Sequence, residues 1–118
     1  MSKTESSKNV GPHALVSISG ATSGTHSKPF DTRNYTKHSY QVNCSNIGAS
    51  TDLAFYIYAR NDSNNPPKWQ KIAAYRITNS INNNGILYFD CWNFVLAKCA
   101  VVGTFDGASI SVVEKHNA

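Results

Sequence analysis

The sequence lacks any run of 18 or more apolar residues, and its first ten residues, MSKTESSKNV, contain no apolar stretch of the kind that directs secretion. We therefore expect no membrane span and a protein that folds in the reducing cytosol. Charged residues are also scarce, at 15% of the chain, whereas hydrophobic residues make up 41%. This composition differs from that of a disordered chain, and 118 residues suffice for one domain with a buried core.

Cysteines are few, and their spacing indicates no metal site. Cys44, Cys91 and Cys99 include no C-x-x-C pair, and none of the four histidines completes a metal-binding spacing with them. The sequence therefore predicts no metal and no cofactor. We interpret the three cysteines as small buried hydrophobic residues. A Cys91 to Cys99 disulfide, formed after release from a cell, is the alternative.

Catalytic motifs are absent as well. The sequence contains no G-x-S-x-G, no P-loop, no H-E-x-x-H and no G-x-G-x-x-G. Its aspartates are scattered and mostly flank turns, where local hydrogen bonding explains them without general acid–base chemistry. We therefore expect that the protein is not an enzyme.

Short alternations of apolar and polar residues, separated by Gly, Pro, Asn, Asp and Ser, are what the sequence does contain. Tyr40, Val42 and Cys44, for example, alternate with polar residues as in a half-buried strand. No window shows the apolar spacing of a helix, so helix should be nearly absent. We predict strands at residues 13–19, 37–44, 53–60, 69–77, 86–91, 94–102 and 108–115.

The number and spacing of these segments predict the fold class. Asp106-Gly107 is typical of a tight hairpin and should join the last two strands. Seven or eight short strands with regular turn signals predict an all-β chain folded as an antiparallel β-sandwich. A jelly-roll and an immunoglobulin-like topology both remain open.

Two predicted strands are apolar on both faces. In residues 53–59, Ala54, Tyr56 and Tyr58 lie on the face opposite to Leu53, Phe55 and Ile57. The apolar run at residues 94–102 is interrupted only by Lys98. A two-layer sandwich covers only one face of each strand, so the second face requires a partner. We therefore assign Tyr56 and Tyr58 to a candidate interface and expect a homo-oligomer.

Basic residues are concentrated in the first third of the chain. Residues 1–37 contain five Lys or Arg and two acidic residues, a net +3 of the total +4. Residues 1–12 are almost free of apolar side chains, which predicts a flexible N-terminal arm before a single domain at residues 13–118. Lys3 and Lys8 make this arm a candidate contact with a neighbouring subunit. The simpler interpretation is a solvated tail that keeps the protein soluble. The other basic residues are dispersed, so the sequence does not favour a nucleic-acid partner.

Two tryptophans invite a sugar-binding interpretation, because sandwich lectins stack sugar rings on exposed aromatic side chains. Trp69 opens a strand whose next residues include Ile72 and Ala73, so we expect it to be buried and its replacement by Ala to cost about 3 to 5 kcal/mol. Trp92 lies at a loop edge, where it is either an anchor beneath the loop or a binding platform. We keep Trp92 as a binding candidate.

The order of strands and turns carries a family resemblance across residues 28–115. Its elements are Tyr40-Gln41-Val42, Tyr58-Ala59-Arg60-Asn61-Asp62, Trp69 followed by Ile72, Tyr88-Phe89-Asp90, and the alternating end at residues 108–115. In these features the chain resembles small β-sandwich virion structural proteins of tailed bacteriophages. It departs from them in its long Asn-Pro-Pro loop and in Lys98, where Arg is common.

The resemblance implies a structural function. It implies a capsid decoration (cement) protein that binds and stabilises the head lattice, or a tail, neck or fibre component, in a virion assembled in the host cytoplasm. The partners would be the major capsid protein or tail proteins. Because icosahedral shells offer local three-fold sites, a trimer is the preferred oligomer. A carbohydrate-binding module of the virion is the alternative from another class.

Overall fold

A computed structural model of the chain describes residues 12–33, 35, 37–62, 65–90 and 94–117. These residues form nine strands and no helix, so the expected all-β fold is confirmed. In chain order the strands are β1 (Pro12–Ala21), β2 (Thr25–His26), β3 (Phe30–Asp31), β4 (Lys37–Ser45), β5 (Asp52–Arg60), β6 (Gln70–Thr78), β7 (Ile86–Asp90), β8 (Leu96–Thr104) and β9 (Ser109–Asn117). In this part of the chain nothing resembles a helix long and apolar enough to cross a membrane.

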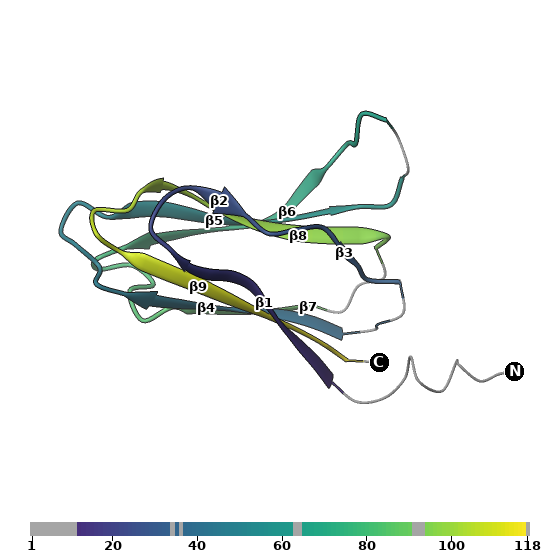
Figure 1. Ribbon diagram of the computed structural model, residues 1–118, viewed down its shortest axis with the longest axis horizontal. Coiled ribbons are helices and arrows are strands. Elements are labelled where there is room, and N and C mark those ends of the chain that lie inside the picture. Colours follow the sequence, from purple (N-terminus) through teal and green to yellow (C-terminus); the bar gives the residue numbers. More distant parts are fainter. Residues whose placement is uncertain (1–11, 34, 36, 63–64, 91–93, 118) are drawn as a thin grey trace, which may run out of the picture.

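The strands form two antiparallel sheets that lie face to face as a sandwich (Figure 1). One sheet has the order β1-β9-β4-β7, and the other has the order β2-β8-β5-β6 with β3 also paired to β8. Because β2 and β3 pair with successive parts of β8, they act as one interrupted strand. With that strand counted once, consecutive strands alternate between the sheets except at β5 and β6. This order is that of a jelly roll and not of an immunoglobulin domain.

The seven predicted strands correspond to β1 and β4 through β9, and two additional strands were not predicted. β2 and β3 contain two residues each, too few for an alternation of side chains to be recognised. Their conformation depends on pairing with β8. Ser27, which lies between β2 and β3, also forms hydrogen bonds with β8. The Ser27 N–H donates to the Cys99 carbonyl at 2.8 Å, and the Cys99 N–H donates to Ser27 Oγ at 3.0 Å.

The Asp106-Gly107 turn is tight, as expected, but it does not form a hairpin. The Ala108 N–H donates to the Phe105 carbonyl at 2.9 Å, and both central residues have positive φ, 48° for Asp106 and 82° for Gly107. However, β8 and β9 belong to different sheets. The predicted hairpin is therefore wrong, because a turn dipeptide fixes a local chain reversal but not the strand with which each arm pairs.

The core lies between the sheets and is built from the inward residues of the alternating strands. Phe55 of β5 and Tyr40 of β4 meet edge to face at its centre, with ring centroids 6.0 Å apart. Cys99 is free and fully buried, which confirms its interpretation as a core residue, whereas Cys44 is half-buried and Cys91 lies outside the described residues. Burial raises the pKa of the Cys99 thiol to about 12, so the thiol stays protonated.

Candidate functional site

The outer surface of the β2-β8-β5-β6 sheet carries a group of aromatic side chains, Tyr56, Tyr58 and Trp69, which we call the aromatic face. Tyr56 and Tyr58 alternate along β5 with the buried residues Phe55 and Ile57, so they point away from the core. Both tyrosines and Trp69 are half-buried. The Tyr56 and Tyr58 rings contact each other edge to face, with centroids 6.0 Å apart. The structure thus brings the two predicted interface tyrosines together.

Basic side chains lie over these rings. Lys71 of β6 places its Nζ 3.8 Å from the centroid of Tyr56, and Lys98 of β8 places its Nζ 4.5 Å from that of Trp69. Both lysines are cross-strand neighbours of Tyr58, one on each side. The Arg60 guanidinium lies 5.6 Å from the Trp69 centroid. These are the distances of cation–π contacts.

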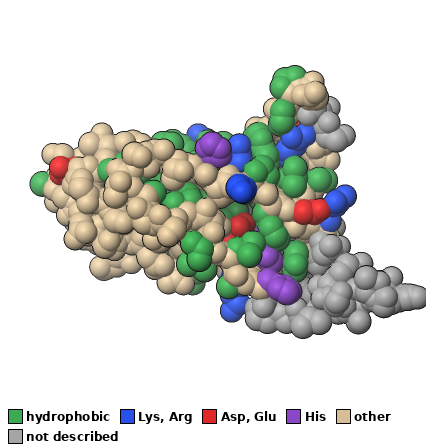
Figure 2. All heavy atoms as spheres, viewed as in Figure 1, with side chains coloured by type: hydrophobic (Ala, Val, Ile, Leu, Met, Phe, Trp, Pro, Cys, Tyr) green, Lys and Arg blue, Asp and Glu red, His purple; other side chains and the backbone are tan. Residues whose placement is uncertain are grey.

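The charges on this surface are only partly neutralised. Arg76 donates from Nε to Asp52 at 2.9 Å, and Arg60 donates from Nη2 to Asp62 at 2.9 Å. Lys71 and Lys98, in contrast, form no ion pair with any residue that the structure describes. In Figure 2 the Lys and Arg side chains in view lie mostly in the right-hand half, several along the upper layer, and the left-hand end carries few charges. The aromatic face therefore presents two positive charges that no carboxylate among the described residues neutralises.

A shallow groove of about 550 Å³ continues the aromatic face along β5. Its floor is apolar, with Ala54 and Tyr56 of β5 between Ala74 of β6 and Val102 of β8. The Arg76 and Asp52 pair closes one end. These side chains thus provide a shallow apolar surface beside the two lysines.

The remaining site residues predicted from the sequence are not described by the structure. Lys3, Lys8 and Trp92 lie outside the described residues, as does most of the predicted arm. Lys71, Lys98 and Trp69 were not assigned to a site from the sequence. They lie on three different strands or loops, and only the register of β5 with β6 and β8 places them together.

Trp69 is half-buried, so the expectation of a fully buried core residue is wrong. It lies just before β6, against Arg60 and Lys98, and not between the sheets. We now expect Trp69→Ala to lower the free energy of unfolding by less than about 3 kcal/mol, below the range for core aromatic residues. Urea titration of the variant would measure this difference, and a loss in the full core range would contradict the observed position.

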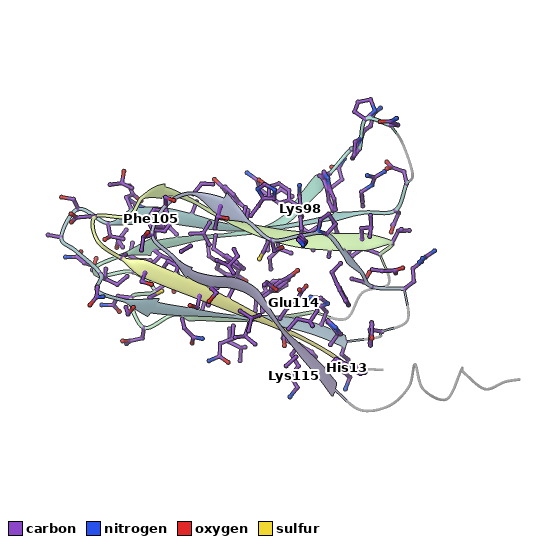
Figure 3. All side chains as sticks on the ribbon, viewed as in Figure 1. His13, Lys98, Phe105, Glu114 and Lys115 are labelled. Carbon is purple, nitrogen blue, oxygen red and sulfur yellow. The ribbon has the colours of Figure 1, made fainter. Side chains whose placement is uncertain are left out.

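A second group of polar side chains is buried between the sheets (Figure 3), with Glu114 at its centre. His38 Nε2 lies 2.7 Å from Glu114 Oε2, and the Ser17 hydroxyl donates to Glu114 Oε1 at 2.8 Å. The Tyr40 hydroxyl is directed to the same carboxylate. Lys115, the next residue after Glu114, points away from the sandwich in Figure 3, as strand alternation requires.

Histidine and aromatic rings extend this buried group towards the end of the sandwich near β3. His116 stacks on Phe30 with centroids 4.0 Å apart and an interplanar angle of 18°. Its ring centroid lies 5.3 Å from that of His38 and 6.2 Å from that of His13. His116 and His38 are 2% and 1% exposed. Sequence reasoning missed this group, although His38 and His116 share the strand parity of the core residues Tyr40 and Val112.

Burial and hydrogen bonding set the ionisation of the group. Burial opposes the ionised form of Glu114, but hydrogen bonds from His38 and other neighbours outweigh it, so the pKa of Glu114 lies below its usual value. Burial lowers the pKa of His116 to about 4, and the nearby His38 acts in the same direction. Burial also raises the pKa of the Tyr40 hydroxyl.

These geometries define what the buried group can do chemically. The Ser17 hydroxyl donates to a carboxylate and not to an imidazole, an arrangement different from the serine–histidine pair of hydrolases. No three metal-ligating side chains among the described residues converge as a metal site would require. The group is therefore best understood as a hydrogen-bonded network inside the fold, whereas the aromatic face is open to a partner.

Comparisons with known proteins add information about the fold. No protein-family model matches the sequence, and no curated protein matches it. The crystal structure of YomS, derived from the SPBc2 prophage, is similar with a TM-score of 0.65 and 14% sequence identity, covering 89% of this chain and 91% of that one. A chain from Bacillus endospore appendages, which form disulfide-linked pili, is similar with a TM-score of 0.51 and 5% identity, covering 91% and 84%. The chain thus shares its fold with a phage-derived protein.

Proposed function

We propose that the protein is a structural, non-catalytic component of a phage virion, and more specifically a capsid decoration protein that docks on the head lattice through its aromatic face. The aromatic face is the observation that carries this proposal, because one sheet combines half-exposed rings, an apolar floor and two lysines that form no ion pair with any described residue. The fold shared with the SPBc2 prophage protein YomS supports the phage context.

The chemistry of the aromatic face suits contact with a protein surface. Tyrosine, tryptophan and arginine are enriched at the centres of protein interfaces, where they combine a large apolar area with a polar group. Lys71 and Lys98 would align with carboxylates of the partner and so orient the contact, while the apolar floor supplies contact area. On a lattice, several such contacts made by an oligomer reinforce one another.

Two other functions are alternatives that experiments can distinguish from capsid decoration. A tail, neck or fibre component would use the same surface on a different partner. A carbohydrate-binding module is favoured by the aromatic rings alone, which could contact sugar rings. A glycan array distinguishes a carbohydrate-binding module from a decoration protein, because a decoration protein should give no signal on the array.

The proposal requires the protein to be present in virions. We expect a mass-spectrometric inventory of gradient-purified particles from the source strain to contain it in many copies. A cryo-electron microscopy map of the same particles should show it on the head. Absence from purified particles would overturn the virion proposal, and a location on the tail would replace decoration by the alternative.

Charge reversal on the aromatic face tests the docking surface. We expect the double variant Lys71→Glu and Lys98→Glu to bind particles at least about tenfold more weakly, since two like charges would then face the carboxylates of the partner. Lys115→Glu is the matched control, because Lys115 is an exposed strand residue on the other sheet. Co-sedimentation with particles that lack the protein measures both. Equal binding by the double variant and the control would argue against this face.

A further inference from the structure

The two sheets end at four edges, and three of them carry features that hinder pairing with another chain. β1 contains two register shifts along its pairing with β9. β6 pairs with β5 through a register shift and exposes Lys71 and Arg76. β2 and β3 are only two residues long. Bulges, charges and very short strands are the usual protections of a sheet edge.

The fourth edge, β7, is longer than β2 and β3, has no register shift, and carries its one charged residue, Asp90, at its end. It pairs with β4 in continuous register, and residues 86–89 are uncharged. Leu87 and Phe89 are 72% and 58% exposed on its outer face. No strand lies beyond β7 in the part of the chain that the structure describes. A regular apolar edge of this kind is a template for pairing with a further strand.

The residues around β7 indicate which strand could pair with this edge. The outer-face neighbours of Leu87 and Phe89 on β4 are Gln41 and Ser39, which carry no charge. Two copies can therefore meet at this edge without repulsion. The aromatic face, with the positive charges of Lys71 and Lys98, would instead repel its own copy.

The edge is also complementary to itself. In an antiparallel pair centred on Tyr88, Leu87 of one copy lies opposite Phe89 of the other, and Phe89 lies opposite Leu87. Both cross-strand pairs are apolar and lie on the same outer face, which is the arrangement that stabilises neighbouring strands. Such reciprocal contacts are the hallmark of a two-fold interface.

We propose that the protein forms a dimer through antiparallel pairing of β7 with β7 of a second copy. The β1-β9-β4-β7 sheet then continues through both copies. Because the two-fold axis is perpendicular to that sheet, both aromatic faces lie on the same side of the dimer. The dimer rests on the β7 edge and not on the virion proposal, and it differs from the trimer that we preferred because icosahedral shells offer local three-fold sites.

Variants at the edge test the dimer by sedimentation equilibrium, up to a protein concentration of about 1 mM. We expect the parent protein to dimerise and Leu87→Lys and Phe89→Lys to be monomeric. Val16→Lys is the matched control, because Val16 is 69% exposed on the same outer face but lies on β1, at the opposite edge. It should dimerise like the parent. Circular dichroism would verify that each variant is folded.

Hydrogen exchange distinguishes edge pairing from other contacts. In the dimer, amide protons of residues 86–90 that point away from β4 should exchange more slowly as protein concentration rises. A parent protein that is monomeric at every concentration would overturn the proposal, as would a dimer that survives both β7 variants. Equal loss of the dimer in Val16→Lys would show that the whole sheet face is buried, which also overturns edge pairing. None of these results depends on whether the protein is found in virions.

Discussion

Replacing Glu114 by Leu is expected to lower the free energy of unfolding by about 3 to 5 kcal/mol, a large part of the stability of an ordinary domain. Glu114 is 3% exposed and accepts hydrogen bonds from His38 and Ser17 inside the sandwich. Leucine has a similar volume but accepts no hydrogen bond, so buried His38 and half-buried Ser17 would both lose their acceptor. Leaving a buried donor without an acceptor costs more free energy than the hydrogen bond itself contributes to stability.

Thermal and urea unfolding followed by circular dichroism would measure the effect of Glu114→Leu. Asp52→Asn is the matched control, since it removes the carboxylate of an exposed ion pair with Arg76 and should change the stability little. We expect the two variants to differ clearly in their urea midpoints. If Glu114→Leu were as stable as Asp52→Asn, the buried network would not contribute to the fold as the structure indicates.

Acidification is expected to destabilise the protein well above the pH at which carboxylates titrate, because of His116. Burial lowers the pKa of His116 from its usual value of 6.5 to about 4, with a contribution from His38. Below pH 6.5 the unfolded chain therefore binds a proton at His116 that the folded chain does not bind. Stability that is fully present above pH 6.5 is lost as the pH falls towards 4, by at most about 3 kcal/mol.

The pH dependence can be assigned to His116 by substitution. His116→Phe keeps an aromatic ring on Phe30, which stacks on His116 at 4.0 Å, but removes the titrating group. We expect urea unfolding of this variant to depend less on pH between 6.5 and 4 than that of the parent. The lowered pKa of Glu114 acts in the same direction but at lower pH, below the usual glutamate value of 4.5. An unchanged slope between pH 6.5 and 4 in His116→Phe would show that His116 is not the source of the effect.

Several features could be predicted from the sequence because they depend on local chemistry. The alternation of Tyr40, Val42 and Cys44 is a property of one strand, and it predicted β4 to within one residue. The seven longer strands and the near absence of helix were predicted in the same way. The tight turn at Asp106-Gly107 followed from the ability of these two residues to adopt positive φ.

Features that combine distant segments could not be predicted. The sequence did not show that β8 and β9 belong to different sheets, because the same turn can close a hairpin or connect two layers. Trp69 was expected in the core, but its environment depends on Arg60 and Lys98 from other segments. The histidines were considered only as metal ligands, since nothing in their spacing shows that Glu114 lies beside His38.

The sequence by itself determined the strands, the turns and the all-β class, because strand periodicity and turn conformation are set by residues close to one another along the chain. Only the tertiary structure decided the jelly-roll order of the sheets, the aromatic face with Lys71 and Lys98, and the buried network around Glu114. Each of these depends on the register between strands far apart in the sequence. That register is fixed by the way all the strands together bury their apolar faces, and no single segment contains it.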